Sequence, residues 1–203
     1  WLDRVLSRHP GDPAALVAKA SSLSRMGYFQ ESIHCCEEVI GKHPLNPDAW
    51  FIRGSVLYMT GRWTEAVPCL VQATAIDRNY TEAWYTLGNC HYYLGEYDDA
   101  IECYDTVIGL DPLYPKAWYN KGVALADVHR YEEALRCYEE CTRISPGVAV
   151  VYTNMGVALA GLGRFQEAIG RFDEAIGINS HDPTPWNNKA ASLRRLARNE
   201  EAE

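Results

Sequence analysis

The feature of this sequence that most limits its fold is a repeat of 34 residues. Trp50, Trp84 and Trp118 recur at that interval, Trp186 follows at twice the interval, and Tyr152 takes the position between them. Two columns of small residues keep the same period: Gly54, Gly88, Gly122 and Gly156, and then Ala66, Ala100, Ala134 and Ala168. A fixed period of this length predicts an array of stacked units without a central core. Such an array presents an extended surface, so binding is the function we expect first.

The unit that begins at Thr81 shows what each repeat is expected to form. Its residues follow helical spacing in two stripes, Trp84, Leu87, Gly88 and His91, and then Ala100, Ile101, Tyr104, Val107 and Ile108. Gly95 lies between the stripes, where a helix can end with a positive φ, and Pro112 stops the second helix. The small residues Gly88 and Ala100 let the two helices approach closely. The pattern therefore predicts a helical hairpin that needs neighbours.

These residues resemble the signature of the tetratricopeptide repeat family, which in this unit is formed by Trp84, Leu87, Gly88, Ala100, Tyr104 and Pro112. The resemblance covers residues 1–203 as a single array, with full units at 13–46, 47–80, 81–114, 115–148 and 149–182 and partial units at 1–12 and 183–203. It implies an all-α, right-handed superhelical solenoid of antiparallel helix pairs. By the same resemblance, the first helices line a concave groove that holds an extended peptide or a partner helix.

Two residues depart from the repeat in ways that affect the backbone. Pro68 lies inside a predicted second helix, where it removes a hydrogen bond and is expected to bend or tighten the first turn. His129 replaces the turn glycine. The replacement either costs backbone strain or is absorbed by a different turn.

Charge and cysteine usage narrow the class of protein. The formal net charge is −8, and the sequence has no concentration of Lys and Arg that would neutralise phosphates, so we expect no nucleic-acid partner. No apolar run approaches the roughly 18 residues of a membrane helix. Four of the seven cysteines share one column, too far apart for disulfides or a shared metal: Cys35, Cys69, Cys103 and Cys137. Buried thiols in a reducing cytoplasm are the expected state.

The resemblance places a strip of mainly aromatic side chains on the groove. It assigns to that surface Phe51, Tyr58, Met59, Tyr85, Asn89, Tyr92, Tyr93, Tyr119 and Asn120. Aromatic residues supply much of the binding energy at interfaces, so this strip is the principal candidate for partner recognition. The alternative is that these tyrosines only cover the helix surface.

One column of amides extends the candidate surface. Asn120, Asn154 and Asn188 recur at the repeat interval and resemble the asparagine ladder in the repeat region of the O-linked N-acetylglucosamine transferases. Such amides could pair with the backbone of an extended chain, or they could have only a structural role. The carboxylate clamp of the family is not expected. Of that clamp Asn89 and Asn120 remain, but no basic residue does.

Catalytic and metal-binding patterns are missing from the sequence. We find no phosphate-binding glycine loop, no nucleophile arrangement and no metal-binding helix motif. His91 is predicted to pack inside the repeat, and acidic residues such as Glu96 and Asp99 suit the start of a helix. We therefore predict no enzyme, no catalytic residue, no metal site and no cofactor.

The sequence leads to one principal function and two alternatives. The principal prediction is a scaffold that binds a protein or peptide ligand in its groove. In the first alternative the array is the docking or oligomerisation region of a larger enzyme, such as a glycosyltransferase or kinase. In the second, the partial units at the two ends stack between molecules, which gives head-to-tail self-association through uncapped ends.

Overall fold

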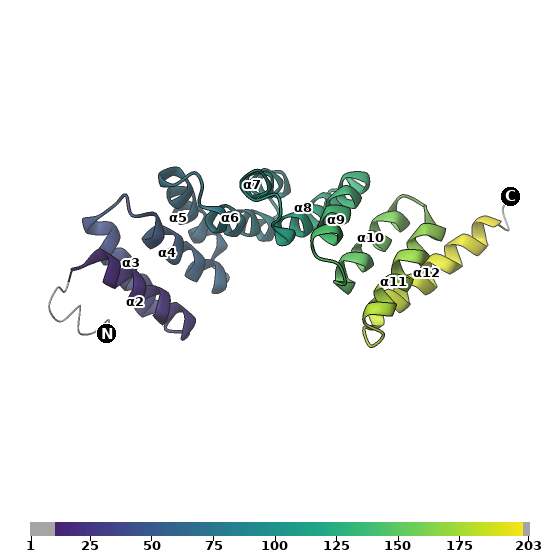
Figure 1. Ribbon diagram of the computed structural model, residues 1–203, viewed down its shortest axis with the longest axis horizontal. Coiled ribbons are helices and arrows are strands. Elements are labelled where there is room, and N and C mark those ends of the chain that lie inside the picture. The colour runs from purple at the N-terminus through teal and green to yellow at the C-terminus, as the bar shows by residue number, and fades with distance from the viewer. Residues whose placement is uncertain (1–10, 201–203) are drawn as a thin grey trace. The chain divides into compact units, whose positions relative to one another are not determined.

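The computed structural model describes residues 11–200, and all regular structure within them is helical (Figure 1). The helices are α2 (Pro13–Arg25), α3 (Phe29–Lys42), α4 (Pro47–Met59), α5 (Trp63–Ile76), α6 (Thr81–Leu94), α7 (Tyr97–Leu110), α8 (Pro115–Asp127), α9 (Tyr131–Ile144), α10 (Ala149–Gly161), α11 (Phe165–Ile178) and α12 (Pro183–Glu200). The prediction of an all-α chain is confirmed. The predicted partial repeat at 1–12 lies almost entirely outside the described residues.

The helices form two compact halves, which divide after Leu110. In the first half, α2 packs on α3, α4 on α5 and α6 on α7, and α3 and α5 also pack on the helix that follows each of them. In the second half, α8 packs on α9, α10 on α11 and α11 on α12, and α9 packs on α10. Each helix pair therefore buries its apolar face against neighbouring pairs, as expected for stacked repeats. The single array over 1–203 and its right-handed winding stay predictions.

Several first helices begin at a recognisable start signal, whereas α6 and α10 have neither a proline in the first turn nor a side-chain cap. Pro13, Pro47 and Pro115 occupy the first turn of α2, α4 and α8, where a missing N–H costs nothing. Two starts are also capped: the side chain of Asp12 accepts a hydrogen bond from the backbone N–H of Ala15 at 2.8 Å, and Asn46 does the same for α4. These local signals give helix starts at the predicted repeat interval.

The tryptophan column ties four of the first helices to the segment before each of them. The indole Nε1 of Trp84 donates a hydrogen bond to the carbonyl of Arg78, at 3.0 Å. The same bond, over the same six residues, joins Trp50 to Pro44, Trp118 to Pro112 and Trp186 to Ser180. Each of these residues therefore packs against its repeat with the ring and fixes the junction with its one polar atom.

The glycine column permits the predicted close approach of the two helices. A Cβ atom added to Gly88 would lie 2.8 Å from Cε1 of Tyr104, and one added to Gly122 would lie 2.5 Å from Cε1 of Tyr138. Ala100 is fully buried on the facing helix of the third repeat. Any larger side chain at these glycines would force the aromatic ring away.

The turns between paired helices keep a left-handed residue. Gly95 ends α6 with φ 79°, which confirms the predicted positive dihedral. His129 has φ 61°. Of the two alternatives for His129, the structure shows the one in which the turn is kept and a side chain accepts the strain. Helix α5 continues through Pro68.

All seven cysteines are free and buried, as predicted. Burial raises the pKa of the Cys36, Cys90 and Cys103 thiols to about 12. Within the described part of the chain, no helix has both the length and the apolar character needed to cross a membrane.

Candidate binding surface

An aromatic cluster lies at the end of the first helices in the second and third repeats. The Tyr93 ring lies 6.0 Å from that of Tyr58 and 5.7 Å from that of Tyr92, between ring centroids. Trp63 stacks on Tyr93 at 4.8 Å with an interplanar angle of 13°. Tyr93 is 52% exposed and Met59, its counterpart one repeat earlier, is 53% exposed. We call Tyr58, Met59, Tyr92 and Tyr93 the aromatic cluster.

The repeat itself brings these side chains together. Tyr58 and Tyr92 are one repeat apart, as are Met59 and Tyr93, so each pair occupies matching positions on α4 and α6, which pack against each other. Burial, and then the neighbouring Tyr93, raise the pKa of Tyr58 to about 12. A hydrogen bond between the Tyr58 and Tyr93 side chains also raises this pKa, so the Tyr58 hydroxyl is already engaged within the cluster.

The other predicted residues of the first half contact aromatic side chains outside the first helices. Phe51 is half-buried against Tyr80, with the ring centroids 4.8 Å apart. Tyr85 is half-buried against Tyr104 at 6.2 Å. Asn89 is only 7% exposed, and its Oδ1 accepts a hydrogen bond from the Tyr104 hydroxyl at 2.8 Å. Of the residues predicted for this surface in the first half, Asn89 therefore offers a ligand the least area.

In the second half, the predicted amides and tyrosine are partly engaged with one another. The side-chain amide of Asn154 donates a hydrogen bond to the hydroxyl of Tyr119, at 3.2 Å. Burial raises the pKa of Tyr119, against the opposing effect of this bond. Asn120, on α8 next to Tyr119, is half-buried. The amide column therefore takes part in contacts within the protein.

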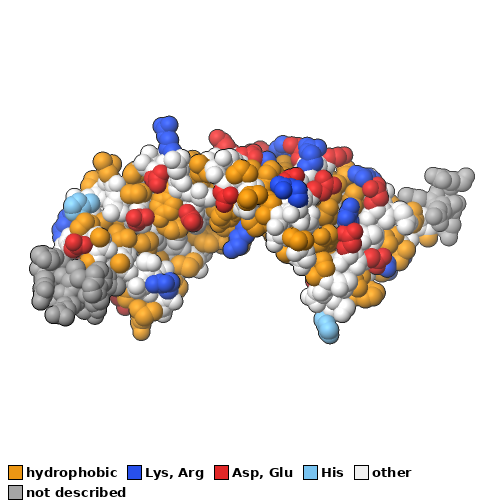
Figure 2. Space-filling view, in the orientation of Figure 1, with side chains coloured by type: hydrophobic (Ala, Val, Ile, Leu, Met, Phe, Trp, Pro, Cys, Tyr) orange, Lys and Arg blue, Asp and Glu red, His pale blue; other side chains and the backbone are white. Residues whose placement is uncertain are grey.

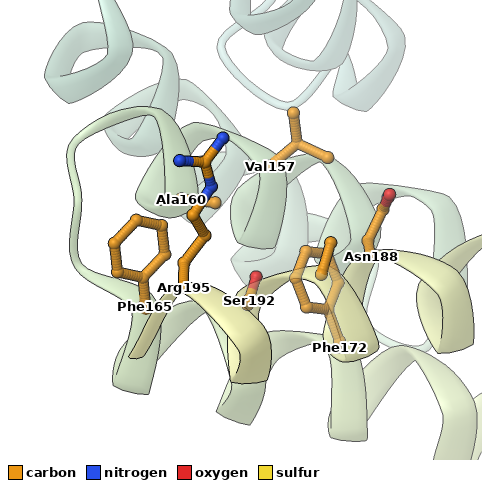
Figure 3. Close-up of a pocket in the computed structure, with 8 residues that line it drawn as sticks. Val157, Ala160, Phe165, Phe172, Asn188, Ser192 and Arg195 are labelled. Atoms are coloured by element: carbon orange, nitrogen blue, oxygen red, sulfur yellow. The ribbon is translucent and has the colours of Figure 1, made fainter. Parts of the chain in front are cut away.

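Asn188 lies in a pocket that sequence reasoning missed. The pocket has a volume of about 260 Å³ and lies between α10, α11 and α12 (Figure 3). Its lining consists of Val157, Ala160, Phe165, Phe172, Asn188, Ala191, Ser192 and Arg195. In Figure 3, the Phe165 ring and the Arg195 guanidinium lie at one end and Asn188 at the other. The signal available in the sequence was the run of small residues Ala191 and Ser192 on the last helix.

One arginine–glutamate pair recurs at the same positions of three repeats. Arg62 forms two hydrogen bonds with Glu65, both at 2.7 Å, and the same arrangement recurs for Arg130 with Glu133 and Arg164 with Glu167. On the face that Figure 2 shows, Lys and Arg are interspersed with Asp and Glu.

A second group of polar side chains lies at the turn between α6 and α7. The Nδ1 atom of His91 lies 2.6 Å from Oε2 of Glu96, and Asp99 completes a group whose ligand-type atoms all lie within 4.8 Å of one another. His91 is partly exposed here, although the sequence predicted a packing role for it inside the repeat.

Comparisons with known proteins agree on the fold. Three descriptions of the tetratricopeptide repeat match residues 17–80, 81–114 and 113–180, which together cover most of the chain. A crystal structure of MamA is similar with 24% identity and a TM-score of 0.79, over 83% of this chain and 92% of that one.

The structure of YrrB, described as a TPR protein with an unusual peptide-binding site, is similar with 20% identity and a TM-score of 0.85, over 93% of this chain and 97% of that one. No curated protein matches the sequence. The period, the helix pairs and these matches lead to one conclusion: the chain belongs to the tetratricopeptide repeat family.

Proposed function

We propose that this protein is an interaction scaffold that binds a partner polypeptide on the surface formed by the first helices of its repeats and has no chemistry of its own. The observation that carries the proposal is the aromatic cluster, in which Tyr93 lies against Tyr58 and Tyr92 and is about half exposed, as is Met59 at the matching position of the preceding repeat. Exposed apolar patches of this kind mark interaction sites. Membership of the family, and the peptide-binding site described for YrrB, support a polypeptide as the ligand.

The chemistry of the cluster indicates which ligand side chains would be bound. Stacked rings supply apolar area at low entropic cost, and Met59 adds a flexible side chain that adapts to the ligand. We therefore expect the ligand to place an aliphatic or aromatic side chain on Tyr93.

The pocket of the second half would take one further side chain. Its walls are mainly apolar, with Phe165 and Phe172 on one helix and Val157 on another, and Arg195 and Asn188 provide polar groups. A pocket with few polar groups on apolar walls suits an apolar anchor whose backbone is held by hydrogen bonds. This pocket is a separate subsite in the proposal, and its contribution can be measured with Arg195→Ala.

The test compares capture of partners from a lysate of the source cell by the unaltered protein and by a Met59→Ser, Tyr93→Ser variant. Both side chains are about half exposed, so the fold should remain intact, as circular dichroism would show. The captured protein is then identified, and binding of its peptides is measured by fluorescence polarisation. We expect the variant to bind at least about tenfold more weakly, because hot-spot residues contribute roughly 2 kcal/mol or more each.

A matched control is Leu45→Ser, which removes a more exposed apolar side chain outside the cluster. Binding by this control should equal that of the unaltered protein. Equal binding by all three proteins would remove the aromatic cluster from the proposal.

One observation favours self-association as a second candidate. Trp186 and Leu193 on α12 are 49% and 47% exposed, whereas Leu57, which holds the position of Leu193 in the second repeat, is 2% exposed. An apolar stripe of this kind can stack on another copy. Sedimentation over a range of concentrations tests it, and a constant monomer mass would count against it.

That the array serves a larger enzyme stays a prediction, which the full gene would test.

A further inference from the structure

The third repeat differs from the others at three positions around the turn between its two helices. At the eleventh position the other full repeats carry leucine, whereas the third carries His91. At the sixteenth and nineteenth positions the second, fourth and fifth repeats carry arginine and glutamate, whereas the third carries Glu96 and Asp99. In one repeat, an apolar residue and an ion pair are therefore replaced by an imidazole and two carboxylates.

The usual residues at these positions stabilise the repeat. The leucines of the second, fourth and fifth repeats are buried, with exposures of 2%, 1% and 4% for Leu57, Leu125 and Leu159. The arginine and glutamate pair through two hydrogen bonds, as in Arg164 with Glu167 at 2.7 and 2.6 Å. The third repeat has neither the buried leucine nor the arginine–glutamate pair at its turn. Two carboxylates now lie where other repeats have one carboxylate and one guanidinium, so the local charge is more negative by two.

The backbone of the turn holds the three substituted residues together. Gly95 adopts φ 79°, and the N–H of Glu96 donates a hydrogen bond to the carbonyl of His91 at 2.9 Å. This bond fixes the end of α6 to the residue before α7, and Asp99 follows in the first turn of α7. As a result Nδ1 of His91 lies 2.6 Å from Oε2 of Glu96, and the ligand-type atoms of all three residues lie within 4.8 Å of one another.

We propose that His91, Glu96 and Asp99 form a binding site for a divalent transition-metal ion. Zinc is bound by imidazole nitrogen and carboxylate oxygen at about 2.0 to 2.2 Å, so ligand atoms of one ion are about 3 Å apart. Nδ1 of His91 and Oε2 of Glu96 are now 2.6 Å apart in a hydrogen bond, so a small rotation of the exposed Glu96 side chain would give them this separation. Glu96 and Asp99 are exposed, so rotation of the Asp99 side chain can close the remaining distance without moving the helices.

The ligand set selects the class of ion. An imidazole favours zinc, nickel, cobalt and iron, whereas magnesium and calcium prefer sites made entirely of oxygen. Three protein ligands leave at least one position for water or for a group of another molecule. The ion would also replace the positive charge that arginine supplies in neighbouring repeats. This site goes beyond the proposed function, because it lies at the turn between helices and does not require a bound polypeptide.

The test is a calorimetric titration of the whole chain with Zn²⁺ at pH 7.5, repeated with two variants that restore the residues of the other repeats. These variants are His91→Leu and Glu96→Arg. Because each restores what the second, fourth and fifth repeats contain, both should fold, as circular dichroism would confirm. We expect one Zn²⁺ per chain in the unaltered protein and an affinity at least about tenfold lower in each variant.

A control and a spectrum separate this site from other zinc ligands. His34→Gln removes an exposed histidine of the first repeat that has Glu31 one turn away on the same helix, and it should leave the affinity unchanged. Co²⁺ bound at the proposed site should show d–d absorption bands without the thiolate charge-transfer band that a cysteine ligand would give.

Three results would overturn the proposal. The first is an affinity for Zn²⁺ that is the same in His91→Leu as in the unaltered protein, and the second is absence of binding to the unaltered protein. The third is equal competition by Mg²⁺, which would indicate a carboxylate site without the imidazole. A Met59→Ser, Tyr93→Ser variant that still binds Zn²⁺ but captures no partner would show that the two proposals are independent.

Discussion

At the scale of single residues, His129 shows that the turn of each repeat requires a left-handed backbone conformation. Its φ of 61° is the left-handed conformation that Gly27, Gly61, Gly95 and Gly163 adopt at the same position, with φ between 75° and 83°. A side chain in this conformation costs roughly 1–2 kcal/mol, because Cβ approaches the following carbonyl oxygen. The contact of the His129 ring with the Tyr131 hydroxyl at 2.7 Å is exposed and offsets little of that cost.

We predict that His129→Gly raises the free energy of unfolding by about 0.5 to 1 kcal/mol, since relief of strain exceeds the larger chain entropy of glycine in the unfolded state. Urea unfolding followed by circular dichroism measures it. The reciprocal change Gly163→His should lower stability by about 1 kcal/mol. A loss of stability in both variants would show that the His129 side chain makes contacts worth more than the strain.

The buried thiols predict a loss of stability in alkali. Burial raises the pKa of the Cys36, Cys90 and Cys103 thiols from 9.0 to about 12, so the folded state keeps them neutral while the unfolded state ionises them. For a raised pKa of this kind, the contribution is complete below pH 9 and is lost as the pH rises from 9 to about 12.

We therefore expect the free energy of unfolding to fall between pH 7 and pH 10. Cys90→Ala should make that fall smaller by about 1 kcal/mol, because one thiol no longer ionises on unfolding. Alanine already occupies this position in the next two repeats, at Ala124 and Ala158, so the variant should fold. Urea unfolding at the two pH values gives the fall in the free energy of unfolding for each protein. An equal fall in the unaltered protein and in Cys90→Ala would contradict the assignment to Cys90.

At the scale of helices, the spacing within each pair depends on one glycine. A Cβ on Gly122 of α8 would lie 2.5 Å from Cε1 of Tyr138, which is itself buried on α9. The ring has no room to move without displacing its neighbours, because interiors of this kind are closely packed. The separation between α8 and α9 is therefore set by the backbone of α8 against an aromatic face.

Gly122→Ala should accordingly destabilise the protein by about 1 to 3 kcal/mol through overpacking. Thermal or urea unfolding provides the value. Gly170→Ala in α11 is the matched change, since nothing lies within 4 Å of a Cβ at that position. It should stabilise the protein by about 0.5 to 1 kcal/mol through helix propensity alone. If the two variants shifted in the same direction, the close approach would not determine stability.

At the scale of the whole molecule, the repeat made most of the fold predictable. The spacing of Trp84, Gly88 and Gly95 located one helix pair, and a shift of 34 residues along the sequence located the others. This works because equivalent residues pack in the same way in every repeat. The single exception at a turn, His129, left two alternatives because sequence alone does not show whether a backbone bends or bears strain.

The candidate surface was less predictable than the fold. The repeat placed Tyr58, Tyr92 and Tyr93 on neighbouring first helices, but it did not show the stacking of Trp63 or the burial of Asn89, which depend on side chains of the second helices. His91 was interpreted alone as a packing residue, and Glu96 and Asp99 as helix-start residues. The backbone of the turn between α6 and α7 brings the three side chains within 4.8 Å of one another, and only the structure shows this proximity.

The tryptophan bond to the preceding carbonyl has a consequence for how repeats are exchanged. Donor and acceptor are six residues apart, as in Trp118 and Pro112, so the bond lies within one short stretch of chain that begins before α8 does. A segment that starts at Pro112 contains both the donor and the acceptor of this hydrogen bond wherever it is inserted. A segment that starts at Pro115 contains the indole N–H of Trp118 but lacks the carbonyl of Pro112. Duplication, deletion or engineered shuffling of these repeats should therefore succeed best at boundaries three residues upstream of the helix.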